Sequence, residues 1–458
     1  MWCSMCARLL YGTNPAFAQR GTNTDNRQCS ILKSTPTLKA PMNQLALFLP
    51  CAAGVQDYLL PEVLRITGLP ASDAVKQRGG VQVRASWRDA LLLNLHCRLA
   101  QRVLVQLSHT QYRHEQDLYR AAGEVAWEIW FTPRQSIKIE VTAQHSPLTS
   151  LNFAALKIKD AVCDRFRDKA GGVRPDVDTR WPDIRIYAHL TTDTCTLYLD
   201  TSGEPLFKRG WREDKGDAPL KETLAAAMIA ASGWPEALEA AASKGEPLPP
   251  FYDPCCGSGT IAIEAAQIAC NIAPGLLRQF AFEKMLPFQP HVWVAIKNAA
   301  ANAQIARPGL VFGSDVAHRM VDFAERNAER AGVAASVEFR GGDALQRLPP
   351  TPTPGVMLLN PPYGERIAVA GVAGEQAGQF GARELAHTDD GGDFFPQLAS
   401  HWKKNFSGWT AWMLTPDMKM PGKMRLKESR KVPMWNGPIE CRLFKFDLIK
   451  GSARERVN

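Results

Sequence analysis

Residues 251–260 have the sequence FYDPCCGSGT, and the apolar, alanine-rich residues 261–270 follow directly. This pattern predicts the end of a strand, a glycine turn and the start of a helix. At the carboxyl edge of a parallel sheet, that combination forms a binding site for a nucleoside-bearing cofactor. Glycines let the backbone approach the ligand, and the helix start offers unpaired N–H groups to a carboxylate. The stretch is not a phosphate loop, because the Lys-Ser/Thr ending is absent.

Two further strands are expected to end in acids. Residues 310–315 lead to Asp315, which is suited to accept hydrogen bonds from both ribose hydroxyls. A helix over 319–331 and a strand over 336–340 then lead to Asp343, which could accept from the exocyclic amine of adenine. Each acid taken alone is better explained as a turn or helix cap. Three acids at successive strand ends, with Asp253 as the first, favour a ligand site in a parallel sheet covered by helices on both faces.

A fourth strand predicts the reaction. Residues 356–359 are apolar and deliver Asn360, Pro361, Pro362 and Tyr363. Proline stiffens this turn, so the Asn360 side-chain oxygen and the Pro361 carbonyl can both accept from one planar amino group. Tyr363 offers a ring face on which a base can stack. Such a site holds an –NH₂ group with its nitrogen aimed at an electrophilic methyl group, whereas a proline-rich turn with a packing tyrosine is the alternative without chemistry.

The remaining sequence divides into regions. Residues 1–41 are poor in large apolar residues and are expected to be disordered or an upstream extension before Met42. Short strands and helices alternate over 42–205, which predicts an α+β region, and 213–217 resemble a linker. The strand and helix series over 206–450 predicts an α/β domain, followed by a tail over 451–458. In the α+β region, strands are expected over 45–49, 137–141, 184–190 and 196–200, and helices over 56–67 (ended by Gly68), 87–95, 118–127 and 153–169; a further helix is expected over 220–231.

Charge and composition set the class of protein. The excess of Lys and Arg over Asp and Glu is +4 for residues 1–41, +3 for 42–216, −5 for 217–422 and +6 for 423–458. Basic ends around an acidic middle suit a polyanionic substrate, although solvated surface charge explains the same numbers. The absence of an apolar run of membrane-spanning length and the scattered cysteines favour a cytoplasmic protein without a membrane partner. Cys3, Cys6 and Cys29 lack a fourth ligand, so no metal is expected.

At this point the sequence resembles the class I methyltransferases. The stretch 253–260 is similar to their cofactor loop, and 360–363 to the tetrapeptide of amine- and amide-methylating members. Residues 49–59 (LPCAAGVQDYL) are similar to the opening of RNA methyltransferases that carry a THUMP domain. Three stretches resemble the guanine-N2 methyltransferases of bacterial 23S rRNA: 206–212, 219–225 and 436–443. Val55-Gln56 departs from the more frequent Leu-Glu of the family, at a place remote from the chemistry.

The resemblance implies a Rossmann-like methyltransferase sheet behind a ferredoxin-like and THUMP RNA-binding region. It also implies S-adenosyl-L-methionine as cofactor and transfer of its methyl group to the exocyclic N2 of a guanine in 23S rRNA, as a step of rRNA processing. Because the base must reach the pocket, it would be flipped out or single-stranded. The implied catalytic residues are Asn360, Pro361 and Tyr363, and the implied cofactor contacts are Asp253, Cys255, Gly257, Gly259, Thr260, Asp315, Asp343 and Ala344.

Several alternatives stay open on the sequence. Tyr363, Arg209 and Arg212 are candidate RNA contacts, although both arginines could equally be ordinary surface residues. The thiols of Cys255 and Cys256 are expected to pack the turn, because a nucleophilic cysteine belongs to carbon methylation. The glycine-rich residues 368–392 would form a lid or a disordered insertion. A second methyltransferase domain making 7-methylguanine, present in some family enzymes, is expected to be absent. The rival functions are a tRNA guanine-N2 methylase, a DNA adenine-N6 methylase and a non-enzymatic RNA-binding module.

Overall fold

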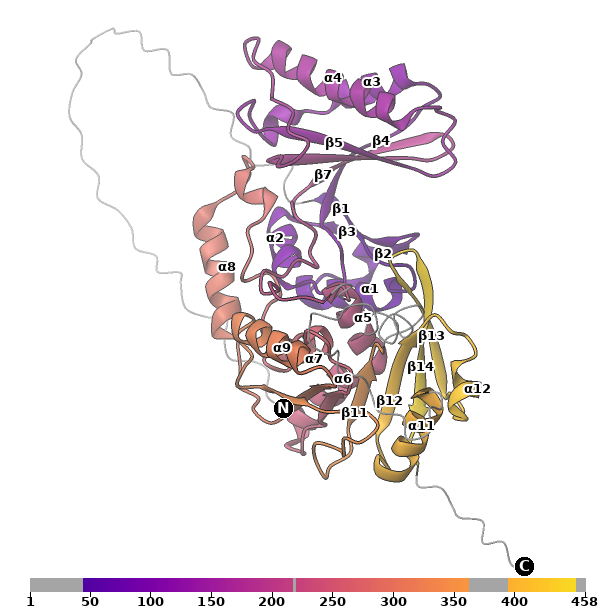
Figure 1. Cartoon of the computed structure of the whole chain (residues 1–458). Coiled ribbons are helices and arrows are strands. Elements are labelled where there is room, and N and C mark those ends of the chain that lie inside the picture. Colours follow the sequence, from indigo (N-terminus) through magenta and orange to yellow (C-terminus); the bar gives the residue numbers. More distant parts are fainter. Residues whose placement is uncertain (1–43, 217–219, 362–393, 450–458) are drawn as a thin grey trace, which may run out of the picture. The chain divides into compact units, whose positions relative to one another are not determined.

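The computed structural model describes residues 44–216, 220–361 and 394–449, which fold into two seven-stranded sheets (Figure 1). The N-terminal sheet has the strand order β2-β3-β1-β4-β7-β6-β5, and its neighbours run antiparallel except for β5 and β6. Its strands are β1 (Leu45–Pro50), β2 (Ala74–Gln77), β3 (Gly80–Ala85), β4 (Leu104–Gln111), β5 (Ile137–Ala143), β6 (Ile184–Leu190) and β7 (Thr194–Asp200).

Four α-helices pack on this sheet in two pairs, α1 with α2 beside β2 and β3, and α3 with α4 beside β4 and β5 (Figure 1). The helices are α1 (Gln56–Thr67), α2 (Trp87–His96), α3 (Glu115–Glu124) and α4 (Leu151–Lys169), with short 3₁₀ turns at Ala71–Asp73 and Trp127–Ile129. The α+β character expected for this region is confirmed. Helix α1 ends as expected at Gly68, whose positive φ of 67° suits glycine.

One expected helix was wrong at its end. A helix was expected over 118–127, but α3 ends at Glu124 and Val125 is extended. The reason is Trp127, whose fully buried ring leaves the helix path and whose indole N–H donates to the Ala122 carbonyl at 2.8 Å. The indole thus satisfies a carbonyl at the helix end in place of a further helical turn.

The C-terminal sheet has the strand order β10-β9-β8-β11-β12-β14-β13. The first five run parallel, and β14 and β13 add an antiparallel edge. Chain order reverses between β8 and β11, which is the topological switch point where ligands bind in open α/β sheets. The strands are β8 (Phe251–Asp253), β9 (Val311–Asp315), β10 (Val337–Gly341), β11 (Val356–Leu359), β12 (Thr410–Thr415), β13 (Arg430–Asn436) and β14 (Ile439–Asp447).

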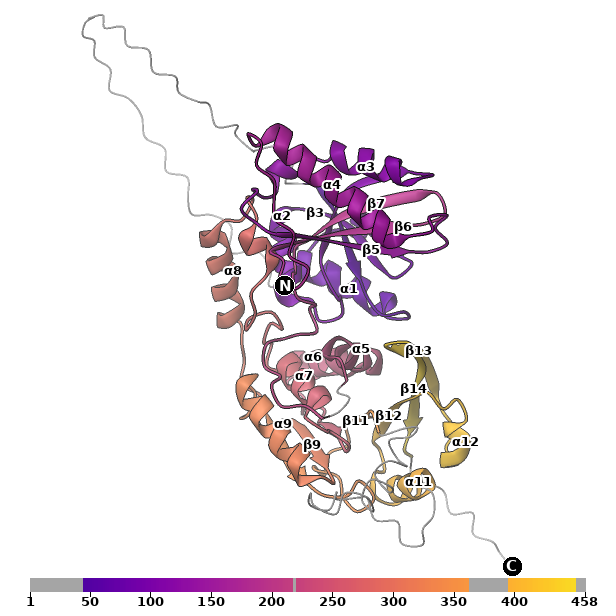
Figure 2. The ribbon, with the colours of Figure 1, turned by 45° about the horizontal axis from the view of Figure 1, so that its top comes forward.

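Helices cover both faces of this sheet, as the sequence predicted (Figure 2). On one face lie α5, α7 and α9, which pack with Phe251, Val311 and Leu358. On the other face lie α11 and α12, which pack with strand residues of the opposite parity such as Tyr252 and Phe312. The helices are α5 (Glu222–Ser232), α6 (Trp234–Lys244), α7 (Thr260–Ala269), α8 (Pro290–Asn302), α9 (His318–Arg330), α11 (Phe394–Asn405) and α12 (Met420–Met424), with a 3₁₀ turn at Ala281–Lys284.

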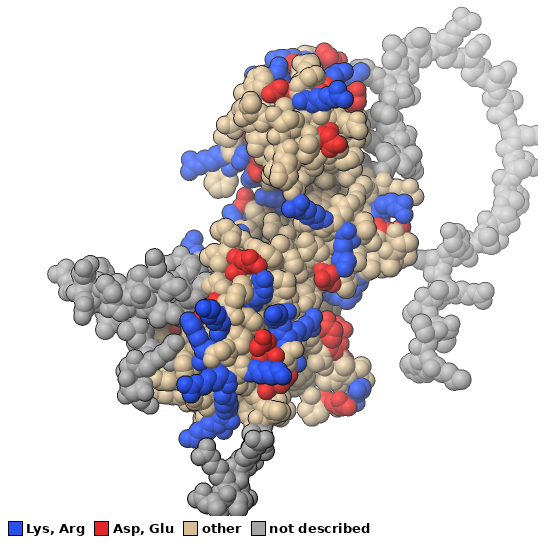
Figure 3. Space-filling view, turned by 90° about the vertical axis from the view of Figure 1, so that its right-hand side faces the viewer, with Lys and Arg blue, Asp and Glu red and all other residues tan. Residues whose placement is uncertain are grey.

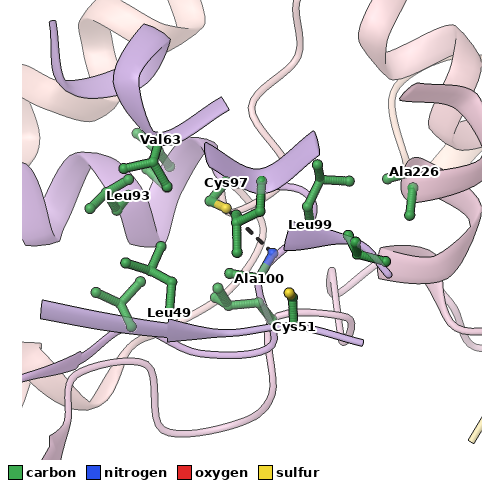
Figure 4. Packing of buried hydrophobic residues seen from close by; sticks show 14 of the residues in the cluster. Leu49, Cys51, Val63, Leu93, Cys97, Leu99, Ala100 and Ala226 are labelled. Atoms are coloured by element: carbon green, nitrogen blue, oxygen red, sulfur yellow. Dashed lines mark hydrogen bonds between the residues drawn. The ribbon is translucent and has the colours of Figure 1, made fainter. Parts of the chain in front are cut away.

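The residues from Pro41 onward form one compact unit with a continuous core that joins the two sheets. Figure 4 shows part of this core: Leu49 of β1, Val63 of α1 and Leu93 of α2 lie on one side of Cys97 and Ala100, and Leu99 lies on the other side, toward Ala226 of α5. Cys97 and Ala100 form a tight turn here, since the Ala100 N–H donates to the Cys97 sulfur at 3.4 Å. Among the described residues, no helix combines the length and the apolar character that a membrane span requires.

Candidate active site

The centre of the site is the glycine loop, which we define as Pro254–Gly259 between β8 and α7. Gly257 has φ 52° and Gly259 has φ 86°, a backbone region in which side chains are strained. Gly259 also lacks room, because a Cβ there would lie 3.0 Å from the Ala324 Cβ and 3.0 Å from the Ile263 Cδ1. The local sequence therefore needs glycine at the turn that starts α7 for both conformational and steric reasons. The first helical residue, Thr260, is buried.

Asp315 at the end of β9 connects directly to this loop. One carboxylate oxygen accepts from the Gly257 N–H at 2.9 Å, and the other accepts from the Ala317 N–H at 3.0 Å. These two bonds fix the orientation of the carboxylate, and each oxygen retains lone-pair capacity for a further donor. Burial raises the pKa of Asp315 above its usual value of 3.8, while the two backbone N–H groups oppose that shift.

The other predicted acids converge on the same edge. Asp343 follows β10, is buried, and accepts from the Leu345 N–H at 2.9 Å, with Ala344 buried beside it. The half-buried Cys255 lies in the field of all three acids: burial is the main reason that the pKa of its thiol is raised, and the charges of Asp253, Asp315 and Asp343 add to that shift. A raised thiol pKa disfavours a thiolate nucleophile.

Asp253 closes β8 and is almost fully buried. One of its oxygens accepts from the Cys255 N–H at 3.1 Å, but its Oδ2 is buried without a hydrogen-bond partner among the described residues. Burial raises the pKa of this carboxyl well above its usual value. A buried acceptor that lacks a partner costs free energy, so it marks a position where a ligand donor would be stabilising.

Asn360 presents a second such atom. It directly follows β11, whose Leu359 pairs with Met413 of β12 and whose Met357 pairs with Tyr252 of β8. Asn360 Oδ1 is buried and has no hydrogen-bond partner in the part of the chain that the structure describes. The next residue, Pro361, is buried. Asn360 and Asp253 thus end neighbouring parallel strands at one sheet edge, and each has an unpaired buried oxygen. Tyr363 and the candidate lid 368–392 lie outside the described residues.

Arg209 does not occupy the place expected of an RNA contact. It is 2% exposed, and its guanidinium donates to Glu264 (Nε to Oε1, 3.0 Å) and to the carbonyls of Leu206 and Arg98. Arg98 also pairs with Glu264 at 3.2 Å, so two arginines share one fully buried carboxylate of α7. The predicted phosphate contact is therefore wrong for Arg209, because its donors are committed inside the protein.

Arg212 is directed at the glycine loop. Its Nη2 donates to the Thr260 hydroxyl at 2.7 Å, and its Nη1 lies 3.5 Å from the Ser258 hydroxyl. Its Nε donates to the buried Glu222 of α5 at 2.7 Å. The arginine side chain is 11% exposed, so it faces the loop and α5 and not an open RNA surface. This placement corrects the expectation of an RNA contact and assigns Arg212 to the support of the loop.

The stretch 213–216 within the expected linker is held firmly. The fully buried Asn327 of α9 accepts from the Glu213 and Asp214 N–H groups and donates to the carbonyls of Asp214 and Ser258. The Asp214 carboxylate pairs with Arg326 at 2.9 Å and Arg330 at 2.5 Å, and these partners lower its pKa to about 2. Sequence reasoning missed Asn327, because all hydrogen-bond partners of its side chain except Arg330 are more than sixty residues away and no local pattern marks it.

Comparison with known proteins agrees with this geometry. The sequence matches three family descriptions: an RMKL-like methyltransferase domain over residues 209–383, a THUMP domain over 112–200 and the RlmL ferredoxin-like domain over 46–104. The matched regions are a ferredoxin-like domain, a THUMP domain and a methyltransferase domain, in the order that the sequence resemblance implied.

Individual proteins and solved structures are similar to most of this chain. A protein of Psychromonas ingrahamii named ribosomal RNA large subunit methyltransferase K/L is 36% identical over 403 residues, which are 87% of this chain and 49% of that protein. The chain thus spans about half the length of the curated relatives it matches. A crystal structure titled "SMU.472, a putative methyltransferase complexed with SAH" superposes with a TM-score of 0.72 at 26% identity, covering 88% of this chain and 98% of that chain. A structure from Listeria monocytogenes titled as an N6-adenine-specific DNA methylase gives 0.73 at 26%, covering 88% and 96%.

Proposed function

We propose that this chain transfers a methyl group from S-adenosylmethionine to the exocyclic N2 of a guanine in 23S ribosomal RNA. The observation that carries the proposal is that two buried side-chain oxygens beside the glycine loop, Asp253 Oδ2 and Asn360 Oδ1, have no hydrogen-bond partner among the residues that the structure describes. The names of the curated relatives support ribosomal RNA as substrate, and the SAH in the SMU.472 structure supports the cofactor.

The residues of this edge fit S-adenosylmethionine. Asp315 is oriented by Gly257 and Ala317 and retains acceptor capacity for ribose hydroxyls. The start of α7 offers backbone N–H groups to the methionine carboxylate, with the Arg212 guanidinium nearby. Asp253 Oδ2 would accept from a donor of the cofactor, and Asp343 is placed for the adenine. The cofactor supplies an electrophilic methyl group on a sulfonium.

Asn360 and Pro361 would position the nucleophile. The lone pair of guanine N2 is delocalised into the ring, so the site must favour a more tetrahedral nitrogen as bonding begins. Asn360 Oδ1 and the Pro361 carbonyl would accept from the two N–H bonds and so orient the nitrogen toward the methyl group. Tyr363 would stack on the base. The proton can leave after methyl transfer, so no side chain needs a strongly shifted pKa to act as a general base.

The N-terminal region would bind the folded RNA. A THUMP domain joined to the methyltransferase domain through a shared core suits recognition by shape and backbone, with the target base flipped out or single-stranded. Cytoplasmic localisation belongs to the same proposal, because ribosomal RNA is made and modified in the bacterial cytoplasm.

The test measures incorporation of labelled methyl groups into 23S rRNA, tRNA and duplex DNA, followed by mass spectrometry of the modified nucleosides. We expect N2-methylguanosine in 23S rRNA. Asn360→Ala should lower kcat on the order of 100-fold or more with an unchanged Kd for S-adenosylmethionine. Asn302→Ala, which removes an exposed asparagine of α8, is the matched control and should retain full turnover. Full turnover by the Asn360 variant would defeat the proposed site, and N6-methyladenine in DNA would replace the proposed substrate.

A further inference from the structure

The described surface carries a strongly basic segment that the proposed site does not use. Residues 419–431 contain six Lys or Arg and a single acid, Glu428, for a net charge of +5. All six basic residues are exposed, whereas Glu428 is half-buried. Figure 3 shows Lys and Arg gathered in the lower half of the face that carries α12 and β13. We name these six residues the basic strip: Lys419, Lys423, Arg425, Lys427, Arg430 and Lys431.

The strip connects two parts of the proposed RNA-binding and catalytic machinery. Lys419 lies four residues past Thr415, the end of β12, and β12 runs parallel to β11, which Asn360 directly follows. At the other end of the strip, the Arg430 Nη2 lies 3.4 Å from the Tyr58 hydroxyl of α1 in the N-terminal region. The basic residues therefore lead from the catalytic sheet edge toward the ferredoxin-like region.

Local ion pairing explains little of this charge. Lys423 pairs with Asp417 at 2.8 Å. Arg425, Lys427 and Lys431, in contrast, form no ion pair with any described residue. Their positive charge is held in place by apolar neighbours, because Met424 and Val432 anchor the segment in the core. Arg425, Lys427 and Lys431 are therefore exposed cations that have no counterion among the described residues.

Arg425 gives an independent sign of function. It is the residue after α12, with φ 48° and ψ 38°, a left-handed conformation that usually belongs to glycine at this position. The hydrogen bonds from the Arg425 N–H to Gly422 and from the Leu426 N–H to Pro421 complete the helix-ending motif. An arginine in this place is strained, which points to a use of its exposed side chain.

Protection of a sheet edge is the simpler explanation for some of these charges. Strand β13 is an edge strand, and charged side chains on such strands prevent unwanted pairing. That explanation covers Arg430 and Lys431, which lie on β13, but not Arg425 and Lys427, which precede it. Edge protection also works with charges of either sign, so it does not explain why the charged residues here are nearly all basic.

We propose that the basic strip binds the phosphate backbone of the substrate RNA between the N-terminal region and the catalytic edge. The inference rests on the proposed function for the identity of the RNA. Exposed cations in a row are the usual contacts for a polyanionic backbone, and Arg425, Lys427 and Lys431 form no ion pair within the described part of the chain. The contact would be independent of base sequence. It would hold the RNA while Asn360 receives the target base.

The test compares three variants of the full chain. Lys427→Gln/Lys431→Gln removes two charges from the strip. Arg425→Gly removes one and relieves the left-handed strain, so its Tm should be unchanged or higher. Lys244→Gln is the control, which removes one exposed lysine of α6 that forms no ion pair with a described residue. Binding to protein-free 23S rRNA is measured over a range of salt concentrations, and methylation is measured at saturating S-adenosylmethionine.

We expect the strip double variant to lower the slope of log K against log salt by about one to two and to raise the KM for RNA about tenfold near 0.1 M salt. The kcat and the KM for S-adenosylmethionine should stay unchanged, and the control should behave as the wild type. Arg425→Gly should weaken RNA binding without loss of Tm. RNA slopes and KM values equal to those of the wild type in both strip variants would overturn the inference. Absence of methylation by the wild type would contradict the proposed function instead, while the binding slopes would still decide the role of the strip.

Discussion

The placement of Arg212 makes a prediction that separates support of the glycine loop from contact with RNA. Arg212→Met removes the partner of Glu222, and the two side chains are only 11% and 5% exposed. Breaking a buried ion pair by removing one member costs about 3–5 kcal/mol, because the remaining charge stays buried without compensation. That cost is a large share of the stability of an ordinary domain, about 5–15 kcal/mol.

The sign of the pH dependence follows from Glu222. Burial already raises its pKa above the usual value of 4.5, and loss of the arginine would raise that pKa further. The folded variant then holds a proton that the unfolded chain releases, so its free energy of unfolding should fall as pH rises from about 5 to 8. Urea unfolding of wild type and variant across this range measures the difference.

A double variant separates stability from loop support. Arg212→Met/Glu222→Met replaces the pair by apolar side chains, which should recover most of the lost stability. It still lacks the donor to the Thr260 hydroxyl at 2.7 Å, so calorimetry should show SAH binding weakened about tenfold, the equivalent of about 1.4 kcal/mol. The reasoning is refuted if the double variant binds SAH like the wild type. An increased KM for RNA with unchanged SAH affinity would restore Arg212 as an RNA contact.

Three further outcomes are expected. Because burial raises the pKa of Asp315, its ionisation should be linked to cofactor binding. SAH should bind more tightly as pH rises from about 5 to 7, and calorimetry in buffers of different ionisation enthalpy should detect the release of a proton on binding. Equal heats of binding in all buffers would contradict this link. Gly259→Ala should destabilise the fold by about 1–2 kcal/mol and weaken SAH binding, since its φ is 86° and its Cβ would press on Ala324; a wild-type Tm would show that the turn adapts. Arg209→Met should lower the free energy of unfolding by about 3 kcal/mol and leave the salt dependence of RNA binding unchanged. A weaker salt dependence in this variant would show that Arg209 contacts RNA after all.

The features that were predicted correctly from the sequence are those that depend on residues close together in the chain. The glycine loop, the strand ends at Asp315 and Asn360 and the alternation of strands with helices all depend on neighbours within a few residues, and the structure brings them to one sheet edge. The pairing of β14 between β12 and β13 was not predicted: the Asn436-Gly437 turn marks a hairpin of β13 and β14, but no local pattern says which of its two strands pairs with β12. Arginine burial was equally hidden: Arg209 meets Glu264 across 55 residues, and only tertiary packing decides whether an arginine faces solvent or a carboxylate.

The shared carboxylate of Glu264 has a consequence for how such enzymes can be recombined. One of its two guanidinium partners, Arg98, belongs to the N-terminal region, and the other, Arg209, lies at the start of the matched methyltransferase domain. A chimera that joins another protein's RNA-binding region to this methyltransferase domain would remove Arg98. Glu264 would then stay buried with one cationic partner instead of two, and the desolvation of its carboxylate would lower the stability of the fold. Modules that carry an equivalent arginine should be exchangeable, whereas others would need Glu264 replaced in the same step.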